Sequence, residues 1–138
     1  MDPLEEITGR QLTIKPIGYI RSPITVKDLA PKMGSEESVI GELVIDSSYA
    51  DALVGLEPGQ KILILYWMDK AERDTLQVHP RRDYSRPIRG VFSTRSPDRP
   101  NPIAIDTVEI LEINGMVLKV RGIDALDQTP LVDIKNAV

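Results

Sequence analysis

The sequence contains no cysteine and only one histidine among its 138 residues. Without cysteine, the chain has neither a disulfide framework nor a thiolate zinc site. A single histidine, His79, also argues against a histidine-based metal site and against a serine–histidine triad. We therefore expect no bound metal, and we expect His79 to be an exposed loop residue beside Pro80.

Long apolar runs are also missing. No stretch reaches the length of a membrane span, and the first ten residues, MDPLEEITGR, lack the apolar region of a signal peptide. We therefore expect a cytoplasmic protein with no membrane partner. The length fits one domain, and because no repeat or linker divides the chain, we expect a single domain over residues 1–138.

Charge of one sign is concentrated in one segment. The chain carries a net charge of −4, yet residues 79–99 hold six arginines against two aspartates. Arginine suits planar, bidentate contacts with phosphate, so the segment favours binding of a nucleotide or another polyanion. The alternative is an exposed loop that its charge keeps soluble. The arginines are Arg81, Arg82, Arg86, Arg89, Arg95 and Arg99.

The same segment ends in the most unusual run of the chain, TRSPDRPNPI at residues 94–103. Proline fixes φ and donates no backbone hydrogen bond, which excludes a helix interior or a central strand. Three prolines in ten residues also stiffen a loop. Such a loop can hold Arg95, Arg99 and Asn101 in one geometry, as a binding site requires. The alternative is a structural proline corner whose arginines are solvated.

The remaining pattern predicts mostly strands. Asn114-Gly115 is a strong hairpin signal, and a slip in the apolar phase between Ile105 and Val108 suggests a bulge near Asp106. The nearly continuous apolar run at 61–68 predicts a strand buried on both faces. Residues 69–87 predict a long loop, and a brief helix over 48–53 is capped by Asp46 or Ser47. Strands are expected at 12–20, 39–45, 61–68, 89–92, 103–113, 116–121 and 131–134.

This inventory predicts a mainly β, single-domain chain: an antiparallel, barrel-like sheet, closed or half-closed, with one or two short helices. Tyr66 and Trp67 lie in the strand expected to be buried, so we interpret them as core residues.

Three segments resemble the TsaA-like family, whose bacterial members include the TrmO-type tRNA methyltransferases. They are PIGYIRSP at 16–23, RGVFSTRSPDRPNPIAID at 89–106 and DALDQTPLVDIK at 124–135. The resemblance covers about 14–135, and it implies a β-barrel-like methyltransferase that uses S-adenosylmethionine. The chain agrees in lacking the GxGxxG fingerprint of dinucleotide-binding folds. The implied reaction is methylation of the exocyclic nitrogen of threonylcarbamoyladenosine, next to the tRNA anticodon.

The resemblance also implies cofactor-binding positions. They lie in the loop after the first strand, after the expected buried strand, in the proline run and just beyond it, and in the DALDQTP segment. These positions are Met33, Gly34, Ser35, Asp69, Lys70, Arg95, Ile105, Asp124, Ala125, Leu126 and Asp127. An arginine can clamp the carboxylate of the cofactor, an aspartate can bind its diol or ammonium group, and apolar side chains can cover its adenine. Asp124 and Asp127 could instead be simple turn residues.

The catalytic residues stay open. The presumed acceptor nitrogen is acylated and weakly nucleophilic, so loss of its proton to a carboxylate or to water would help the transfer. Asp127 and Asp106 are the candidate bases. Asp106 stands where the family more often carries a small polar residue, and its alternative role is a polar bulge residue.

For RNA, an anticodon loop presents unstacked bases on which aromatic and guanidinium planes can stack. The candidate RNA-binding residues are Arg81, Arg82, Tyr84, Arg86 and Arg99. The resemblance to this family also implies a homodimer. The sequence ends at Val138, directly after the DIK motif, and this predicts a minimal form without the C-terminal domain of the best-known bacterial members.

Three hypotheses follow. The first is an S-adenosylmethionine-dependent tRNA methyltransferase. The second is a protein that binds S-adenosylmethionine without catalysis or for a different substrate, and the third is an RNA-binding module without a cofactor.

Overall fold

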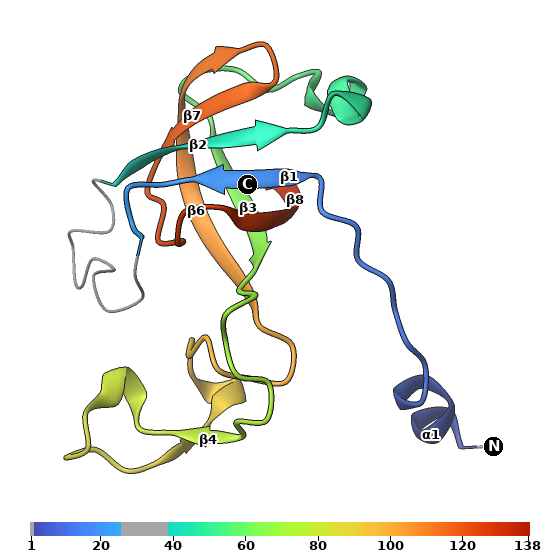
Figure 1. Cartoon of the computed structure of the whole chain (residues 1–138), viewed down its shortest axis with the longest axis vertical. Helices are drawn as coiled ribbons and strands as arrows, with labels where there is room; N and C mark the ends of the chain where they lie inside the picture. Colours follow the sequence, from blue (N-terminus) through green and yellow to red (C-terminus); the bar gives the residue numbers. More distant parts are fainter. Residues whose placement is uncertain (1, 26–38) are drawn as a thin grey trace.

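A closed antiparallel barrel of six strands forms the centre of the chain, in a computed structural model that describes residues 2–25 and 39–138. The strands neighbour one another in the order β1-β2-β7-β6-β3-β8, and β1 pairs with β8 to close the barrel (Figure 1). They are β1 (Gly18–Arg21), β2 (Ile40–Ile45), β3 (Lys61–Trp67), β6 (Ile103–Asn114), β7 (Val117–Arg121) and β8 (Thr129–Asn136). The predicted mainly β, barrel-like fold is confirmed, and the last strand is longer than the predicted 131–134.

The barrel interior is filled by aliphatic side chains that alternate along each strand. Ile20, Leu43, Ile110, Leu118 and Leu131 are all fully buried. Burying each such side chain stabilises the fold by about 1.5–3 kcal/mol. These side chains make the barrel a packed core rather than a channel.

Strand β3 differs from the prediction of a strand buried on both faces. Its inward residues Ile62, Ile64 and Tyr66 are buried, whereas Leu63 and Leu65 are only half-buried. A barrel is a single layer, so one face of every strand points outward. The sequence pattern of β3 is therefore apolar on an outward face as well as on the inward one.

The β6–β7 hairpin is confirmed, with Gly115 in the left-handed region at φ 59°. The prediction of a bulge near Asp106 is wrong, because β3 and β6 pair regularly through Ile64 and Asp106. The irregularity lies farther along, between Ile110 and Glu112 on the β7 side. The apolar phase slips because Ile105 points outward while Asp106 takes an inward position, not because a residue is inserted.

The N-terminal segment also departs from the prediction. Instead of a strand over 12–20, only Gly18–Arg21 is extended and paired, and Leu12 is 85% exposed. A short helix, α1 (Pro3–Thr8), precedes it and was not predicted. Its signals were present, because Asp2 caps the first turn and Pro3 occupies the first helical position. Figure 1 shows α1 away from the barrel, and all its residues are exposed.

The predicted helix near residue 48 is confirmed as the 3-10 segment η3 (Ser47–Leu53). The Asp46 carboxylate caps it by accepting a hydrogen bond from the Ser48 amide at 2.9 Å. Its residues Tyr49 and Leu53 are partly buried and pack against the core.

Residues 69–102 form a lobe that projects from the ends of β3 and β6 (Figure 1). The predicted long loop at 69–87 contains β4 (Gln77–Val78) and the 3-10 turn η4 (Pro80–Arg82). The strand predicted over 89–92 is shorter, because β5 (Arg89–Gly90) pairs with β4 and the chain then turns into η5 (Val91–Ser93). The lobe carries both the arginine-rich segment and the proline run.

Candidate functional site

The proline run is anchored to the start of the lobe by Arg73. The guanidinium of Arg73 donates from Nε to the Pro100 carbonyl at 2.7 Å and from Nη2 to the Asn101 Oδ1 at 2.9 Å. It also lies over the Trp67 ring, 5.1 Å from its centroid. The Glu72 amide donates to the Asp98 carboxylate at 2.9 Å. The run is therefore a fixed loop, as its prolines predicted.

Arg99 forms hydrogen bonds within the lobe. Its Nη2 donates to the carbonyls of Val91 and Thr94, the latter at 3.1 Å, and its side chain is half-buried. These bonds hold η5 against the proline run. The structure thus places Arg99, which we predicted to contact RNA, in an internal role that leaves less of its guanidinium for a ligand.

A pocket of about 360 Å³ lies beside the anchored loop, along β3 and β6. Four of the residues predicted for the site meet there although they are distant in sequence: Arg95 from the lobe, Ile105 and Asp106 from β6, and Asp124 from the segment after β7. Leu63 of β3 and Ile105 of β6 supply the apolar lining of the pocket from the outward faces of these strands. Its remaining lining residues are Thr107 and Gly122.

The Asp106 carboxylate is the best-defined polar group of this pocket. Its Oδ2 accepts a hydrogen bond from the Tyr66 hydroxyl at 3.0 Å and one from the Asp124 amide at 3.1 Å. Burial raises the pKa of Asp106 above its ordinary value, although these two hydrogen bonds and the nearby charge of Arg95 act in the opposite direction. Burial also raises the pKa of Tyr66 far above its ordinary value, so the hydroxyl remains a donor.

The chain after β7 approaches β6 very closely at Gly122. The residue has φ 110°, and a Cβ added there would lie 3.0 Å from the Thr107 carbonyl oxygen. Ile123 and Ala125, which follow, are buried. This close approach brings Asp124 to the rim of the pocket.

Asp127, at the end of the same turn, faces a different part of the molecule. Its carboxylate accepts a hydrogen bond from the Ser22 amide at 3.0 Å, and its own amide donates to the Ile24 carbonyl at 2.7 Å. Leu126 is half-buried, and its carbonyl accepts a hydrogen bond from the Thr129 hydroxyl at 2.7 Å. Asp127 therefore ties the turn to the segment after β1 and does not line the pocket with Asp106.

The other predicted cofactor positions are not brought to this pocket. Asp69 and Lys70 are exposed in the turn that follows β3 and are absent from the pocket lining. Met33, Gly34 and Ser35 lie outside the described residues.

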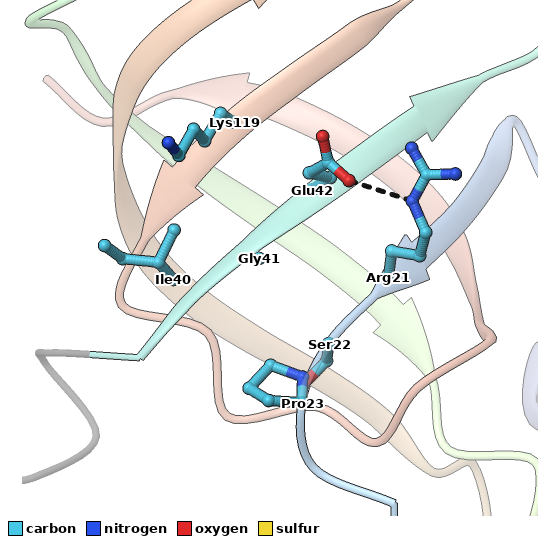
Figure 2. A pocket seen from close by; sticks show the side chains of 7 residues that line it. All are labelled: Arg21, Ser22, Pro23, Ile40, Gly41, Glu42 and Lys119. Atoms are coloured by element: carbon cyan, nitrogen blue, oxygen red, sulfur yellow. Dashed lines mark hydrogen bonds and ion pairs between the residues drawn. The ribbon is translucent and has the colours of Figure 1, made fainter.

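A second pocket, of about 340 Å³, lies over β1, β2 and β7 (Figure 2). Arg21, Glu42 and Lys119 stand in register across these three strands, and Arg21 and Glu42 form an ion pair at 2.9 Å. Ser22, Pro23, Ile40 and Gly41 complete the lining, which contains none of the predicted site residues. Glu112 faces Lys119 on the next strand, so charges alternate along this row. Such alternation gives the barrel surface local pairing rather than an excess of one charge.

The arginine-rich turn of the lobe is shaped by its only histidine. His79 is half-buried; its Nδ1 donates to the Arg86 carbonyl at 3.0 Å, and its ring lies 4.9 Å from that of Tyr84. Arg81 and Arg82 have φ of 54° and 57°, in the left-handed region that side chains rarely adopt. Arg86 pairs with Asp83 at 3.2 Å, and Tyr84 is 77% exposed. The turn presents an aromatic ring among arginines, away from the pocket lining.

Two residues of the site were missed by sequence reasoning. Tyr66 is a core residue as interpreted, but its hydroxyl holds Asp106. Arg73 lies outside the arginine-rich segment, so nothing in its own neighbourhood indicated a contact with residues 100 and 101. A tyrosine at an inward strand position is a usable signal, because a buried hydroxyl requires a partner.

The described residues contain neither a cluster of metal-ligating side chains nor a membrane-spanning helix. Over 2–25 and 39–138, no group of three or more histidine, cysteine or acidic residues gathers as it would around a metal. Over the same ranges, no helix has the length and apolar character needed to cross a membrane.

The sequence profile of the tRNA-methyltransferase O N-terminal domain matches residues 19–138. An S-adenosyl-L-methionine-binding protein of Archaeoglobus fulgidus is 48% identical over 125 residues, which is 91% of this chain and 88% of the relative. A probable S-adenosyl-L-methionine-binding protein of Methanothermobacter thermautotrophicus is 47% identical over 94% of this chain and 92% of its own length.

Solved structures agree with the sequence relatives. The crystal structure of TrmO from Pseudomonas aeruginosa superposes with a TM-score of 0.74 at 31% identity, over 94% of this chain. Another TrmO crystal structure gives a TM-score of 0.76 at 32% identity. The chain spans 55% and 58% of these two crystallised proteins.

Proposed function

The chain belongs to the family of the tRNA-methyltransferase O N-terminal domain, and we propose from this membership that it is an S-adenosylmethionine-dependent methyltransferase acting on tRNA. The observation that carries the proposal is the convergence of Arg95, Ile105 and Asp124 on one pocket. Arg95 and Ile105 belong to the 89–106 motif of the family resemblance, and Asp124 belongs to the 124–135 motif. The names of the archaeal relatives support the same cofactor.

The lining of the pocket fits the chemical groups of S-adenosylmethionine. Arg95 would hold the carboxylate of the amino-acid tail, and the Asp124 carboxylate would hold the ammonium group or the ribose diol. Ile105 and Leu63 would cover the adenine, and the volume lies within the range of small-molecule pockets. When bound, the cofactor supplies a methyl group made electrophilic by a sulfonium. The protein contributes mainly positioning, which can supply a large part of the barrier reduction in such a transfer.

The substrate we propose is the exocyclic nitrogen of threonylcarbamoyladenosine, next to the anticodon. Asp106 is the candidate base that lines the pocket, whereas Asp127 is engaged with Ser22 on the far side of its turn. Burial raises the pKa of Asp106, which makes it a stronger base than an ordinary aspartate and supports it in this role. For Asp127 we propose the structural role of holding the cofactor turn.

The tRNA contacts would come from the lobe. Arg81, Arg82 and Arg86 would contact phosphates, and the exposed Tyr84 ring would stack on an unpaired base. We propose a homodimer as well, because one protomer presents a small surface for a tRNA, and exposed apolar residues of the lobe such as Phe92 offer a contact. A tRNA substrate implies that the protein works in the cytoplasm.

The test is mass spectrometry of tRNA nucleosides after incubation with protein and S-adenosylmethionine. The proposal predicts a methylated form of threonylcarbamoyladenosine in modified tRNA and no product from an unmodified transcript. Methylation of another nucleoside would support the proposed methyltransferase activity and contradict the proposed substrate.

A second candidate function is cofactor binding without methyl transfer to tRNA, which the names of the archaeal relatives favour. Isothermal titration, combined with the nucleoside assay, distinguishes this candidate from a tRNA methyltransferase. Micromolar binding of S-adenosylmethionine without product from any tRNA would support this candidate, whereas tRNA binding without cofactor binding would support a pure RNA-binding module.

A further inference from the structure

Asp106 occupies an inward position on β6 and has aliphatic neighbours along its strand. On β6 the inward positions continue with Val108 and Ile110, both buried, and the residue facing Asp106 on β3 is the fully buried Ile64. Ionising a carboxyl group in such surroundings costs free energy unless strong donors meet it. Its presence there therefore calls for an explanation beyond packing.

Two donors converge on one oxygen of this carboxylate. The Tyr66 hydroxyl reaches Oδ2 from β3 at 3.0 Å, and the Asp124 amide reaches the same atom from the turn after β7 at 3.1 Å. The first donor is fixed, because Tyr66 is a buried residue of a strand paired on both sides. The second belongs to the turn that closes one side of the pocket.

We propose that Asp106 is a positioning residue: its carboxylate, oriented by Tyr66, holds the backbone of Asp124 and so fixes the turn at 124–127 in its ligand-binding form. This inference rests on the proposed S-adenosylmethionine site, and it extends that site to a residue that acts through another. The assignment also makes cofactor affinity depend on the ionisation of Asp106, because a carboxylate is a stronger acceptor than a neutral acid.

The charged and titratable groups around Asp106 set the direction of this dependence. Tyr66 faces it from β3, Asp124 from the turn and Arg95 from the lobe. Because burial raises the pKa of Asp106, its carboxylate takes up a proton at a higher pH than an exposed aspartate does. Cofactor binding should then weaken as the pH falls and Asp106 takes up its proton.

The first arm of the test measures the contact itself in the free protein. The backbone amide proton of Asp124 is followed by NMR between pH 7 and pH 4, in the wild type and in Asp106→Asn. The wild type should show a titration step above the ordinary range of aspartate, and the variant should lack that step. If the titration step persists in Asp106→Asn, the step belongs to another group, and the proposed contact between Asp106 and the Asp124 amide is wrong.

The second arm measures S-adenosylmethionine affinity by isothermal titration over pH 5–7. The wild-type affinity should fall severalfold toward pH 5. Asp106→Asn should bind about tenfold more weakly at pH 7 and show little dependence on pH. Tyr66→Phe should move the midpoint to a higher pH, because the ionised carboxylate has lost a donor. The matched control is Asp51→Asn, at an exposed position of η3, which should behave as the wild type.

The outcomes separate this inference from the proposed function. If the wild type binds S-adenosylmethionine and Asp106→Asn binds it equally well at every pH, the positioning role is wrong and the cofactor site stands. If the wild type does not bind the cofactor at any pH, the proposed function fails, and the NMR arm still decides whether Asp106 holds the turn.

Discussion

Among the residues proposed for the site, Arg95 has the best-defined setting. It lies on a loop that Arg73 fixes from outside the run, and it reaches a pocket whose other charged residues are the aspartates Asp106 and Asp124. A cation in that setting is suited to hold a carboxylate.

Arg95→Ala should lower S-adenosylmethionine affinity at least about tenfold, because it removes a charge-assisted contact. The melting temperature should stay within about one degree, since the Arg95 side chain is exposed. Isothermal titration and thermal unfolding are measured together, with Arg89→Ala in β5 as the control. A melting temperature that falls in parallel with affinity would support the reading of the run as a mere structural corner.

Asp106 predicts an unusual relation between stability and pH. Its pKa is raised in the folded protein, so the folded state binds the proton more tightly than the unfolded chain does. The contribution of Asp106 to the free energy of unfolding should therefore fall as the pH rises from the pKa of an ordinary aspartate to the raised pKa of Asp106. Asp106→Asn should melt at a temperature at least as high as the wild type at pH 7.5, and the difference should close toward pH 4. A variant that melts well below the wild type at pH 7.5 would show that the carboxylate stabilises the fold.

At the scale of elements, the strand pattern could be predicted from sequence and the lobe could not. The hairpin at Asn114-Gly115 and the short helix after Asp46 are local signals, so residues next to one another encode them. The strand expected at 12–20 failed because apolar alternation there has no partner strand to pair with, apart from its last residues. Apolar character indicates burial only where the topology supplies a neighbour.

The candidate site shows the same division. The resemblance placed Arg95, Ile105 and Asp124 on the site from motifs alone, and the structure brings them together. The hydrogen bonds from Tyr66 to Asp106 and from Arg73 to Asn101 join residues that are 40 and 28 positions apart. Such contacts depend on strand register and loop path, which local sequence does not encode.

Close packing of β1 on β2 makes a prediction for the barrel. A Cβ at Gly41 would lie 2.5 Å from the Arg21 carbonyl oxygen and 2.7 Å from the Ile123 side chain, so Gly41→Ala should destabilise the fold by about 1–3 kcal/mol. Chemical denaturation measures the change. Gly90→Ala is the matched control, because the nearest atom to its Cβ would be 4.0 Å away and its effect should be small. Equal effects of the two substitutions would contradict the described register.

At the scale of the whole molecule, charge is divided between an acidic chain and a basic lobe. The net charge is −4, while six arginines lie between residues 79 and 99. An uneven distribution of this kind can direct a polyanion to one face and limit adhesion elsewhere. The left-handed backbone of Arg81 and Arg82 adds a local conformational cost on that face, a feature that often accompanies binding sites.

The joint substitution of Arg81, Arg82 and Arg86 by alanine should weaken tRNA binding and flatten its dependence on salt. Each lost phosphate contact should reduce the slope of log affinity against log salt by about 0.7–0.9. Filter binding at several salt concentrations gives the slope, with Lys135→Ala on β8 as the control. Because these residues do not line the pocket, S-adenosylmethionine affinity should not change. An unchanged salt slope would place the tRNA contact on another face of the protein.

The position of bound S-adenosylmethionine decides whether the proposed site is right, and a crystal structure of the protein grown with this compound shows it directly. We predict density for the compound against Arg95, Ile105 and Asp124, between the lobe and β6. Density in the groove of Arg21, Glu42 and Lys119 instead, with the first pocket empty, would contradict the proposed site.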